Sequence, residues 1–266
     1  MDSMKRFTFS VPQNILFGEG VLKELPGVAG KLGGKHGFII SGPTLNRLGV
    51  VGQCEEILTQ AGIAVSTFCD TEGIHPWRLW NVQQKRSGQV ERTLLLLLAA
   101  VPLWMWQKLS VLWQNMAAAS RNMKGQTRCG GDHPLITIPT TAGTGSEVTA
   151  FSVITDHKRN YKLTVFSYEL IPAYALLDPT LLTSAPASVA AACGVDALIH
   201  AEEAYVSLDA SPFSEAMSEK AMELIGRSIR TYVADRSNRE AASDMLAGSL
   251  FAGMAFSWAR LGTSMP

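Results

Sequence analysis

The chain has 266 residues, of which 47% are hydrophobic, and its 23 basic and 23 acidic side chains balance to zero formal net charge. This length suffices for one large domain or two modest ones, and the balanced charge gives no electrostatic reason to expect binding to nucleic acid or to an anionic membrane surface. The four cysteines form no CxxC pair and the N-terminus lacks the apolar core of a signal peptide, so we expect a cytoplasmic protein with reduced thiols.

Short apolar runs alternate with helical patterns in the first part of the chain. This rhythm of strand, turn and helix is typical of a parallel sheet. We expect extended structure at 7–16, a turn at 18–20, helices at 21–32 and 48–61, and strands at 36–42, 134–139 and 173–177.

From residue 186 onward the pattern changes to long helical stretches. They cover 186–207, 212–235 and 238–259, with apolar residues at helical spacing. The sequence therefore predicts an α/β half followed by an all-helical half, divided near Thr183.

A Gly-rich segment at 140–147 follows the strand predicted at 134–139. Because Gly143 and Gly145 lack Cβ atoms, the backbone there could approach a ligand closely. Backbone amides and the segment's hydroxyl groups could then donate to phosphate oxygens. A turn without any ligand has the same composition, so both interpretations stay open. The hydroxyl groups belong to Thr140, Thr141, Thr144 and Ser146.

Asp196 and His200 stand four residues apart in a stretch rich in alanine. On an α-helix this spacing puts both side chains on one face, one turn apart. A carboxylate and an imidazole so placed can hold one divalent metal, but a metal site needs three or four ligands. No histidine follows His200. The alternative is an ordinary hydrogen-bonded pair on a helix surface.

Together, these segments resemble the iron-containing (group III) alcohol dehydrogenase family. Residues 139–149 look like the nucleotide-loop signature of that family, and residues 194–205 look like its first metal-binding helix. The segments 153–156 and 175–179 fit between them at the family spacing. The resemblance covers 1–73 and 131–262.

The resemblance implies a dehydroquinate synthase-like architecture. An α/β dinucleotide-binding domain would span 1–183, and an incomplete all-α metal-binding domain would span 184–266. It also implies hydride transfer between an alcohol or aldehyde and NAD or NADP, with Fe²⁺ or Zn²⁺ as a Lewis acid. The metal of the family binds one Asp and three His, and by carry-over Asp196 and His200 are the first two ligands.

The resemblance also assigns residues to the cofactor. Lys162 matches a family position that touches it, and Gly42 stands where many members carry an Asp that binds the ribose 2′-hydroxyl, so NADP also fits. We expect a small alcohol or aldehyde as partner, rather than nucleic acid or a membrane, and a homodimer stays open. The loop residues expected to line the cofactor are Thr140, Thr141, Gly143 and Thr144.

Residues 76–130 depart from the family pattern. Five of the six tryptophans lie between Trp77 and Trp113, and the apolar run 94–106 is too short to span a bilayer. The Gly-Gly-Gly-Ser-Pro-x-Asp loop of the family, expected near 99–105, is absent. The neighbouring reading frame permits Gly-Gly-Ser-Pro-x-Met-Asp-Val-Ala there, and Asn-Val-His-Ala at 262–266. We therefore hypothesise a translated frameshift and a truncated chain.

A chain with two metal ligands and no such loop is expected to bind metal weakly and to show no alcohol oxidation. Three other interpretations stay open. The first is an inactive truncated fragment that retains nucleotide binding. The second is a membrane-associated protein that uses 94–106. The third is a Zn²⁺-dependent enzyme of the glycerol dehydrogenase or dehydroquinate synthase type.

Overall fold

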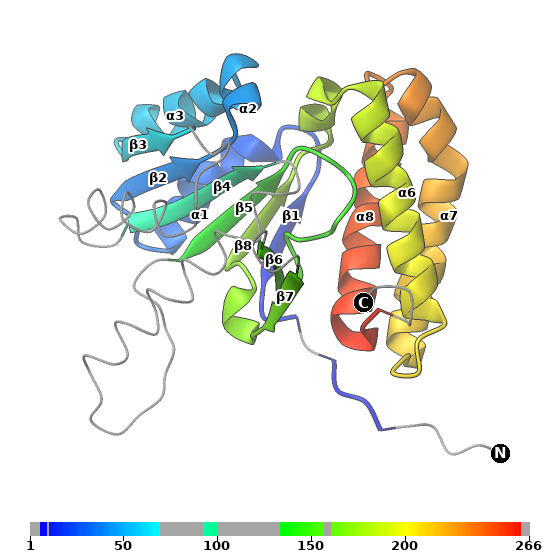
Figure 1. The fold of residues 1–266 in the computed structure, drawn as a ribbon. Helices are drawn as coiled ribbons and strands as arrows, with labels where there is room; N and C mark the ends of the chain where they lie inside the picture. Colours follow the sequence, from blue (N-terminus) through cyan, green and yellow to red (C-terminus); the bar gives the residue numbers. More distant parts are fainter. Residues whose placement is uncertain (1–5, 10, 70–92, 100–133, 157–160, 262–266) are drawn as a thin grey trace, which may run out of the picture. The chain divides into compact units, whose positions relative to one another are not determined.

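The computed structural model describes residues 6–9, 11–69, 93–99, 134–156 and 161–261 (Figure 1). The chain forms two compact units. One, here called the sheet unit, comprises Asn14–Thr140 and Ala150–Leu181. The other, here called the helical unit, comprises Met1–Gln13, Thr141–Thr149 and Leu182–Pro266. The architecture is therefore an α/β unit plus a helical unit, whereas the assignment of functions to 1–183 and 184–266 stays a prediction.

The described part of the sheet unit contains a six-stranded parallel sheet. Its strands run through the segments where the sequence predicts them, apart from β4 and β3, which the sequence pattern did not single out. The order across the sheet is β1 (Asn14–Phe17), β8 (Tyr174–Leu177), β5 (Leu135–Pro139), β4 (Thr93–Ala99), β2 (His36–Ile40) and β3 (Ala64–Phe68).

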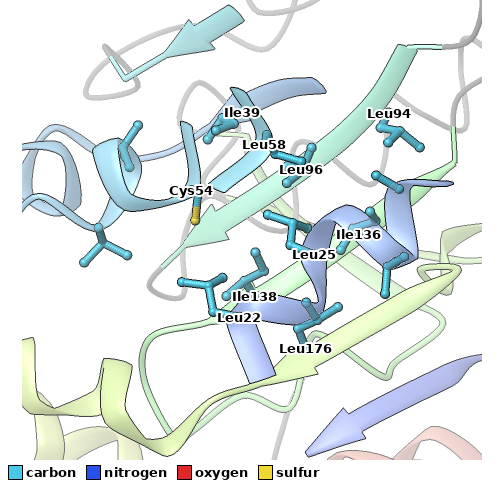
Figure 2. Close-up of a cluster of buried hydrophobic side chains, with 14 of the residues drawn as sticks. Leu22, Leu25, Ile39, Cys54, Leu58, Leu94, Leu96, Ile136, Ile138 and Leu176 are labelled. Carbon is cyan, nitrogen blue, oxygen red and sulfur yellow. The ribbon is translucent and has the colours of Figure 1, made fainter. Parts of the chain in front are cut away.

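Short helices share one apolar core with the sheet. They are α1 (Leu25–Lys31), α2 (Pro43–Arg47) and α3 (Val50–Gln60), with a 3₁₀ turn at Val21–Glu24 leading into α1. Figure 2 shows Leu25 of α1 and Leu58 of α3 among side chains from the sheet strands. Residues of α1 and α3 and residues of the sheet strands thus belong to one buried cluster. The sheet residues labelled there are Ile39, Leu94, Leu96, Ile136, Ile138 and Leu176.

The leucine run 94–98 lies within β4, between β2 and β5 in the sheet. Leu94 and Leu96 are fully buried. The sequence gives this run neither strand alternation nor helical spacing. The reason is that an inner strand of a parallel sheet is covered on both faces and needs apolar residues throughout. The flanking residues 70–92 and 100–133, with Trp77 and Trp113, lie outside the described residues, so the frameshift hypothesis stays a prediction.

Asp178 ties the end of β8 to the start of the first helical turn. Its buried carboxylate accepts the backbone N–H of Leu22 at 3.3 Å. It also accepts the N–H of Thr180 at 3.1 Å and its hydroxyl at 2.6 Å. Asp178 therefore serves as a structural cap within the sheet unit. A 3₁₀ segment, Pro179–Ser184, follows it.

A separate two-stranded antiparallel ribbon joins β6 (Phe151–Asp156) and β7 (Tyr161–Phe166). A 3₁₀ turn at Tyr168–Leu170 then leads toward β8. Lys162 pairs with Thr155 in this ribbon. The position of the Lys162 side chain lies outside what the structure describes.

The helical unit contains α6 (Ala187–Tyr205), α7 (Pro212–Ala234) and α8 (Arg239–Ala259), which lie side by side (Figure 1). These bounds agree closely with the stretches predicted from sequence. Ser211 caps α7 in a reciprocal capping box with Ser214. The Oδ1 atom of Asn238 caps α8 by accepting the N–H of Ala241 at 2.9 Å.

Small residues let the three helices approach closely. A Cβ atom added at Gly194 of α6 would lie 2.8 Å from the Met245 side chain of α8 and 2.9 Å from Ile229 of α7. At Gly248 of α8 it would lie 2.5 Å from Ile225 of α7. A methyl group at either position would therefore require the neighbouring Met and Ile side chains to shift. Within the described residues, none of the helices has the length and hydropathy to cross a membrane.

Candidate metal and nucleotide site

Asp196 and His200 lie on one face of α6, as their spacing predicts. The Nε2 atom of His200 is 3.8 Å from Oδ1 of Asp196. This separation is longer than a hydrogen bond, so the two side chains are close neighbours without a direct hydrogen bond between these atoms. The His200 side chain is 8% exposed and the Asp196 side chain 38% exposed. The pair therefore presents a nitrogen and an oxygen toward each other, with the carboxylate open to solvent.

The surroundings of His200 fit a bound cation. Its ring packs against Phe256 of α8, with ring centroids 4.8 Å apart. Its buried Nδ1 atom has no hydrogen-bond partner in the described part of the chain. Ligand distances of about 2.0–2.2 Å add up to more than the 3.8 Å between Nε2 and Oδ1, so one ion can contact both atoms. Two protein ligands and a hydrophobic wall thus fit half of a metal site.

The described residues bring no third ligand to this pair. Among them, no group of three or more His, Cys, Asp or Glu side chains is placed to hold a metal ion. Weak metal binding therefore stays the prediction for the chain as written.

Most of the Gly-rich segment belongs to the helical unit, while Thr140, the residue after β5, belongs to the sheet unit. The Thr140 side chain is buried, and its Oγ1 atom has no hydrogen-bond partner among the described residues. Within the loop, the N–H of Val148 donates to the carbonyl of Gly145 at 3.1 Å. Gln13 donates from Nε2 to the Glu147 carbonyl at 2.7 Å. The loop is thus a folded turn that leaves a buried hydroxyl at its start unsatisfied.

The two loop glycines have a different neighbour from the one that the sequence analysis expects. A Cβ atom at Gly143 would lie 2.8 Å from Cβ of Cys193 in α6. At Gly145, where φ is +59°, a Cβ atom would lie 2.6 Å from Cα of Gly253 in α8. The missing side chains therefore make room for helices on one side of the loop, and the binding of a ligand by the loop backbone stays a prediction.

Cys193 joins the loop to the metal helix, and the sequence gives no signal for it. It lies one helical turn before Asp196, next to Gly143. Burial raises the pKa of the Cys193 thiol, the Asp196 carboxylate raises it further, and a hydrogen bond with Thr141 lowers it. The thiol therefore stays protonated at neutral pH and behaves as a packing group.

The other cofactor residues predicted from sequence lie apart in the chain. Gly42 precedes α2 as its N-cap, with φ −81° and ψ 157°. This extended conformation is open to any residue, so the backbone does not require glycine there. Thr141 and Thr144 are partly exposed on the loop. The roles of these residues stay predictions.

Two family models match this chain, and both describe iron-containing alcohol dehydrogenases. The family model described as Fe-containing alcohol dehydrogenase family, C-terminal, matches residues 190–264. The model described as iron-containing alcohol dehydrogenase matches residues 105–179.

Individual relatives are longer than this chain. Long-chain-alcohol dehydrogenase 1 of Geobacillus thermodenitrificans is 37% identical over 251 residues, a match that covers 90% of this chain and 61% of the relative. The crystal structure of a 1,3-propanediol oxidoreductase superposes with a TM-score of 0.83 at 30% identity, over 97% of this chain and 68% of that chain. The structure of sulfoacetaldehyde reductase from Bifidobacterium kashiwanohense in complex with NAD⁺ superposes with a TM-score of 0.80 at 25% identity, over 97% of this chain and 68% of that chain.

Proposed function

Because this chain belongs to the iron-containing alcohol dehydrogenase family, we propose that it carries the nucleotide loop and the first two metal ligands of an NAD(P)-dependent oxidoreductase. The reaction is hydride transfer between an alcohol or aldehyde and the nicotinamide ring. The chain spans 61% of the length of the long-chain-alcohol dehydrogenase and 68% of the 1,3-propanediol oxidoreductase. The activity of the whole protein is therefore part of the proposal.

The observation that carries this proposal is the geometry of Asp196 and His200. The two ligand atoms are 3.8 Å apart and His200 is buried. The pair sits one turn beyond Cys193, which touches the loop at Gly143. A metal half-site and a loop of phosphate-binding composition thus belong to one compact unit. That combination supports a site where a metal and a dinucleotide act together.

We assign the roles of the residues as follows. Asp196 and His200 hold Fe²⁺ or Zn²⁺, and the bound metal acts as a Lewis acid that polarises the substrate oxygen. The amides and hydroxyls of Thr141 and Thr144 hold the cofactor phosphates. Thr140 is suited to the same task because its buried hydroxyl lacks a partner among the described residues.

The choice of cofactor and the cellular setting are finer parts of the proposal. The sulfoacetaldehyde reductase structure holds NAD⁺, which supports NAD, while Gly42 leaves NADP open. Lys162 contacts the cofactor by the family pattern. Cys54, Cys69 and Cys193 are free thiols, in keeping with a cytoplasmic enzyme. A homodimer stays open.

Zinc titration tests the metal pair. Isothermal titration of the chain with Zn²⁺ is compared for the unchanged protein, Asp196→Asn and His200→Gln. We expect weak binding that both substitutions abolish, because each removes half of the available ligands. Glu202→Gln is the matched control, since Glu202 is an exposed carboxylate on the same helix. Equal zinc affinity in all four proteins would contradict the assignment of the pair.

A binding assay and a turnover assay separate the enzyme from the inactive fragment. NADH fluorescence titration measures whether the loop binds nucleotide, and NAD⁺ reduction with 1,3-propanediol or a long-chain alcohol measures turnover. We expect nucleotide binding without turnover for the 266-residue chain. Turnover would show that two metal ligands suffice, and no NADH binding at all would count against the nucleotide loop.

A further inference from the structure

We propose that Gly253 of α8 is a positioning residue, which fixes the nucleotide loop against α8 beside α6, the helix that carries the metal pair. The inference concerns how the loop is held, and its consequence for NADH rests on the proposed function. It comes from three glycines whose missing side chains are replaced by backbone of another segment: Gly143, Gly145 and Gly253.

The contact between Gly145 and Gly253 is reciprocal. A Cβ atom at Gly145 would lie 2.6 Å from Cα of Gly253, and 3.0 Å from the Ser249 carbonyl oxygen. A Cβ atom at Gly253 would lie 2.9 Å from both Cα and the carbonyl oxygen of Gly145. Real Cβ atoms do not approach other atoms this closely, and the atoms met here are backbone, which cannot rotate away. The loop and α8 thus meet backbone to backbone.

The loop also meets α6. A Cβ atom at Gly143 would lie 2.8 Å from Cβ, 3.1 Å from Cα and 3.2 Å from the carbonyl oxygen of Cys193. The loop is therefore held at two points, one on each of two neighbouring helices. Two such points fix both its height along the bundle and its tilt.

One point lies one helical turn from Asp196, and the other lies one turn from Phe256, the residue that packs against His200. Cys193 is three residues before Asp196 on α6, and Gly253 is three residues before Phe256 on α8. The ring of Phe256 packs against His200. Since an α-helix is rigid over one turn, the position of the loop relative to Asp196 and His200 is set by these contacts.

Gly253 is the informative position of the three. Gly145 adopts φ +59°, so its backbone favours glycine whatever surrounds it. Gly253 lies inside α8, where helical backbone does not require glycine and where glycine destabilises a helix relative to alanine. The contact with the loop is the feature of this site that explains glycine. Gly226 of α7 is the matched contrast, because a Cβ atom there meets nothing within 4 Å.

Gly253→Ala tests the inference, with Gly226→Ala as control. An added methyl group at 253 must push the loop off α8, which misplaces amides that bind phosphate through distance-sensitive hydrogen bonds. We expect NADH affinity to fall about tenfold or more while Zn²⁺ affinity stays unchanged. A general loss of structure would reduce both affinities and would overturn the positioning role. The control should leave both affinities unchanged and should not lower Tm.

A second readout follows the loop itself. The rate of Cys193 alkylation by iodoacetamide, resolved by peptide mass spectrometry, reports whether Gly143 still covers Cys193. We expect faster alkylation in Gly253→Ala than in the unchanged chain or in Gly226→Ala. If the unchanged chain binds no NADH, the proposed function fails, and the alkylation rates alone still decide the docking. Unchanged alkylation in Gly253→Ala would overturn the inference.

Two further variants keep the test sharp. Gly143→Ala disturbs the loop from the α6 side without altering α8, and we expect the same loss of NADH affinity, so it replaces Gly253→Ala should that variant not fold. Val148→Ala in the Gly253→Ala background removes the Val148 Cγ2 atom, which lies 2.9 Å from the added methyl group. We expect no rescue, because the backbone of Gly145 still blocks the site. Full rescue would mean that the backbone contact is unimportant.

Discussion

Replacement of Leu96 by alanine tests whether the leucine run really builds the interior of the sheet. Leu96 lies in β4, pairs with Ile39 on one side and Ile136 on the other, and is fully buried. Its side chain belongs to the core cluster beneath α1 and α3 (Figure 2). Leu96→Ala should therefore leave a cavity in the buried core of the sheet unit.

The size of the effect follows from the burial. Leu→Ala changes at fully buried sites cost about 2–5 kcal/mol, from lost transfer free energy and the cavity left behind. Leu96 belongs to the upper part of that range because sheet strands flank it on both sides and cannot easily collapse inward. For a chain of this size, about 4 kcal/mol corresponds to a fall in Tm of roughly 8–16 °C.

The assay is urea unfolding of Leu96→Ala followed by circular dichroism, compared with Leu48→Ala. Leu48 is 52% exposed, so its replacement should change the free energy of unfolding by less than about 0.5 kcal/mol. If Leu96→Ala were as mild as Leu48→Ala, the run would not be a buried inner strand. The account of β4 would then be wrong.

Three further predictions concern the helical unit. A hydrogen bond from Arg227 lowers the pKa of Asp244. Asp244→Asn should therefore lower the free energy of unfolding by about 1 kcal/mol at neutral pH, as measured by urea unfolding. The difference should shrink as the pH falls through the lowered pKa of Asp244. Asn238→Ala removes the cap of α8 and should lower the unfolding free energy by about 0.5–2 kcal/mol, whereas Asn238→Asp should not. Tyr232→Phe removes the hydroxyl that donates to the Leu182 carbonyl, and calorimetry should show a loss of about 1 kcal/mol; no loss would mean that water replaces this bond.

The long helices could be predicted from sequence because their signals are local. The stretch 212–235 begins with a proline and is preceded by Ser211, and the stretch 238–259 begins with Asn238. Ser211 and Asn238 each cap the helix that follows. The pairing of Asp196 with His200 was predictable for the same reason, since four residues make one turn of a helix. Such features depend on a few neighbouring residues.

The features that could not be predicted depend on residues far apart in the chain. The position of β4 becomes clear only once β2 and β5 cover its edges, because five leucines in a row carry no periodicity of their own. Likewise, the neighbours of Gly145 come from α8, more than one hundred residues later in the chain. A glycine in a loop is equally compatible with a ligand and with a helix, and only the fold distinguishes them.

The pairing of β1 with β8 means that β1 cannot join the sheet until most of the chain has been synthesised. Asn14 pairs with Tyr174, and Leu22 donates to Asp178, so the first strand waits for a partner made about 160 residues later. At roughly 5–20 residues per second on a ribosome, that delay is on the order of 8–32 seconds. Throughout it, the amides and carbonyls of 14–17 have no strand to pair with. During synthesis, β1 therefore stays accessible to chaperones until β8 has been made and can pair with it.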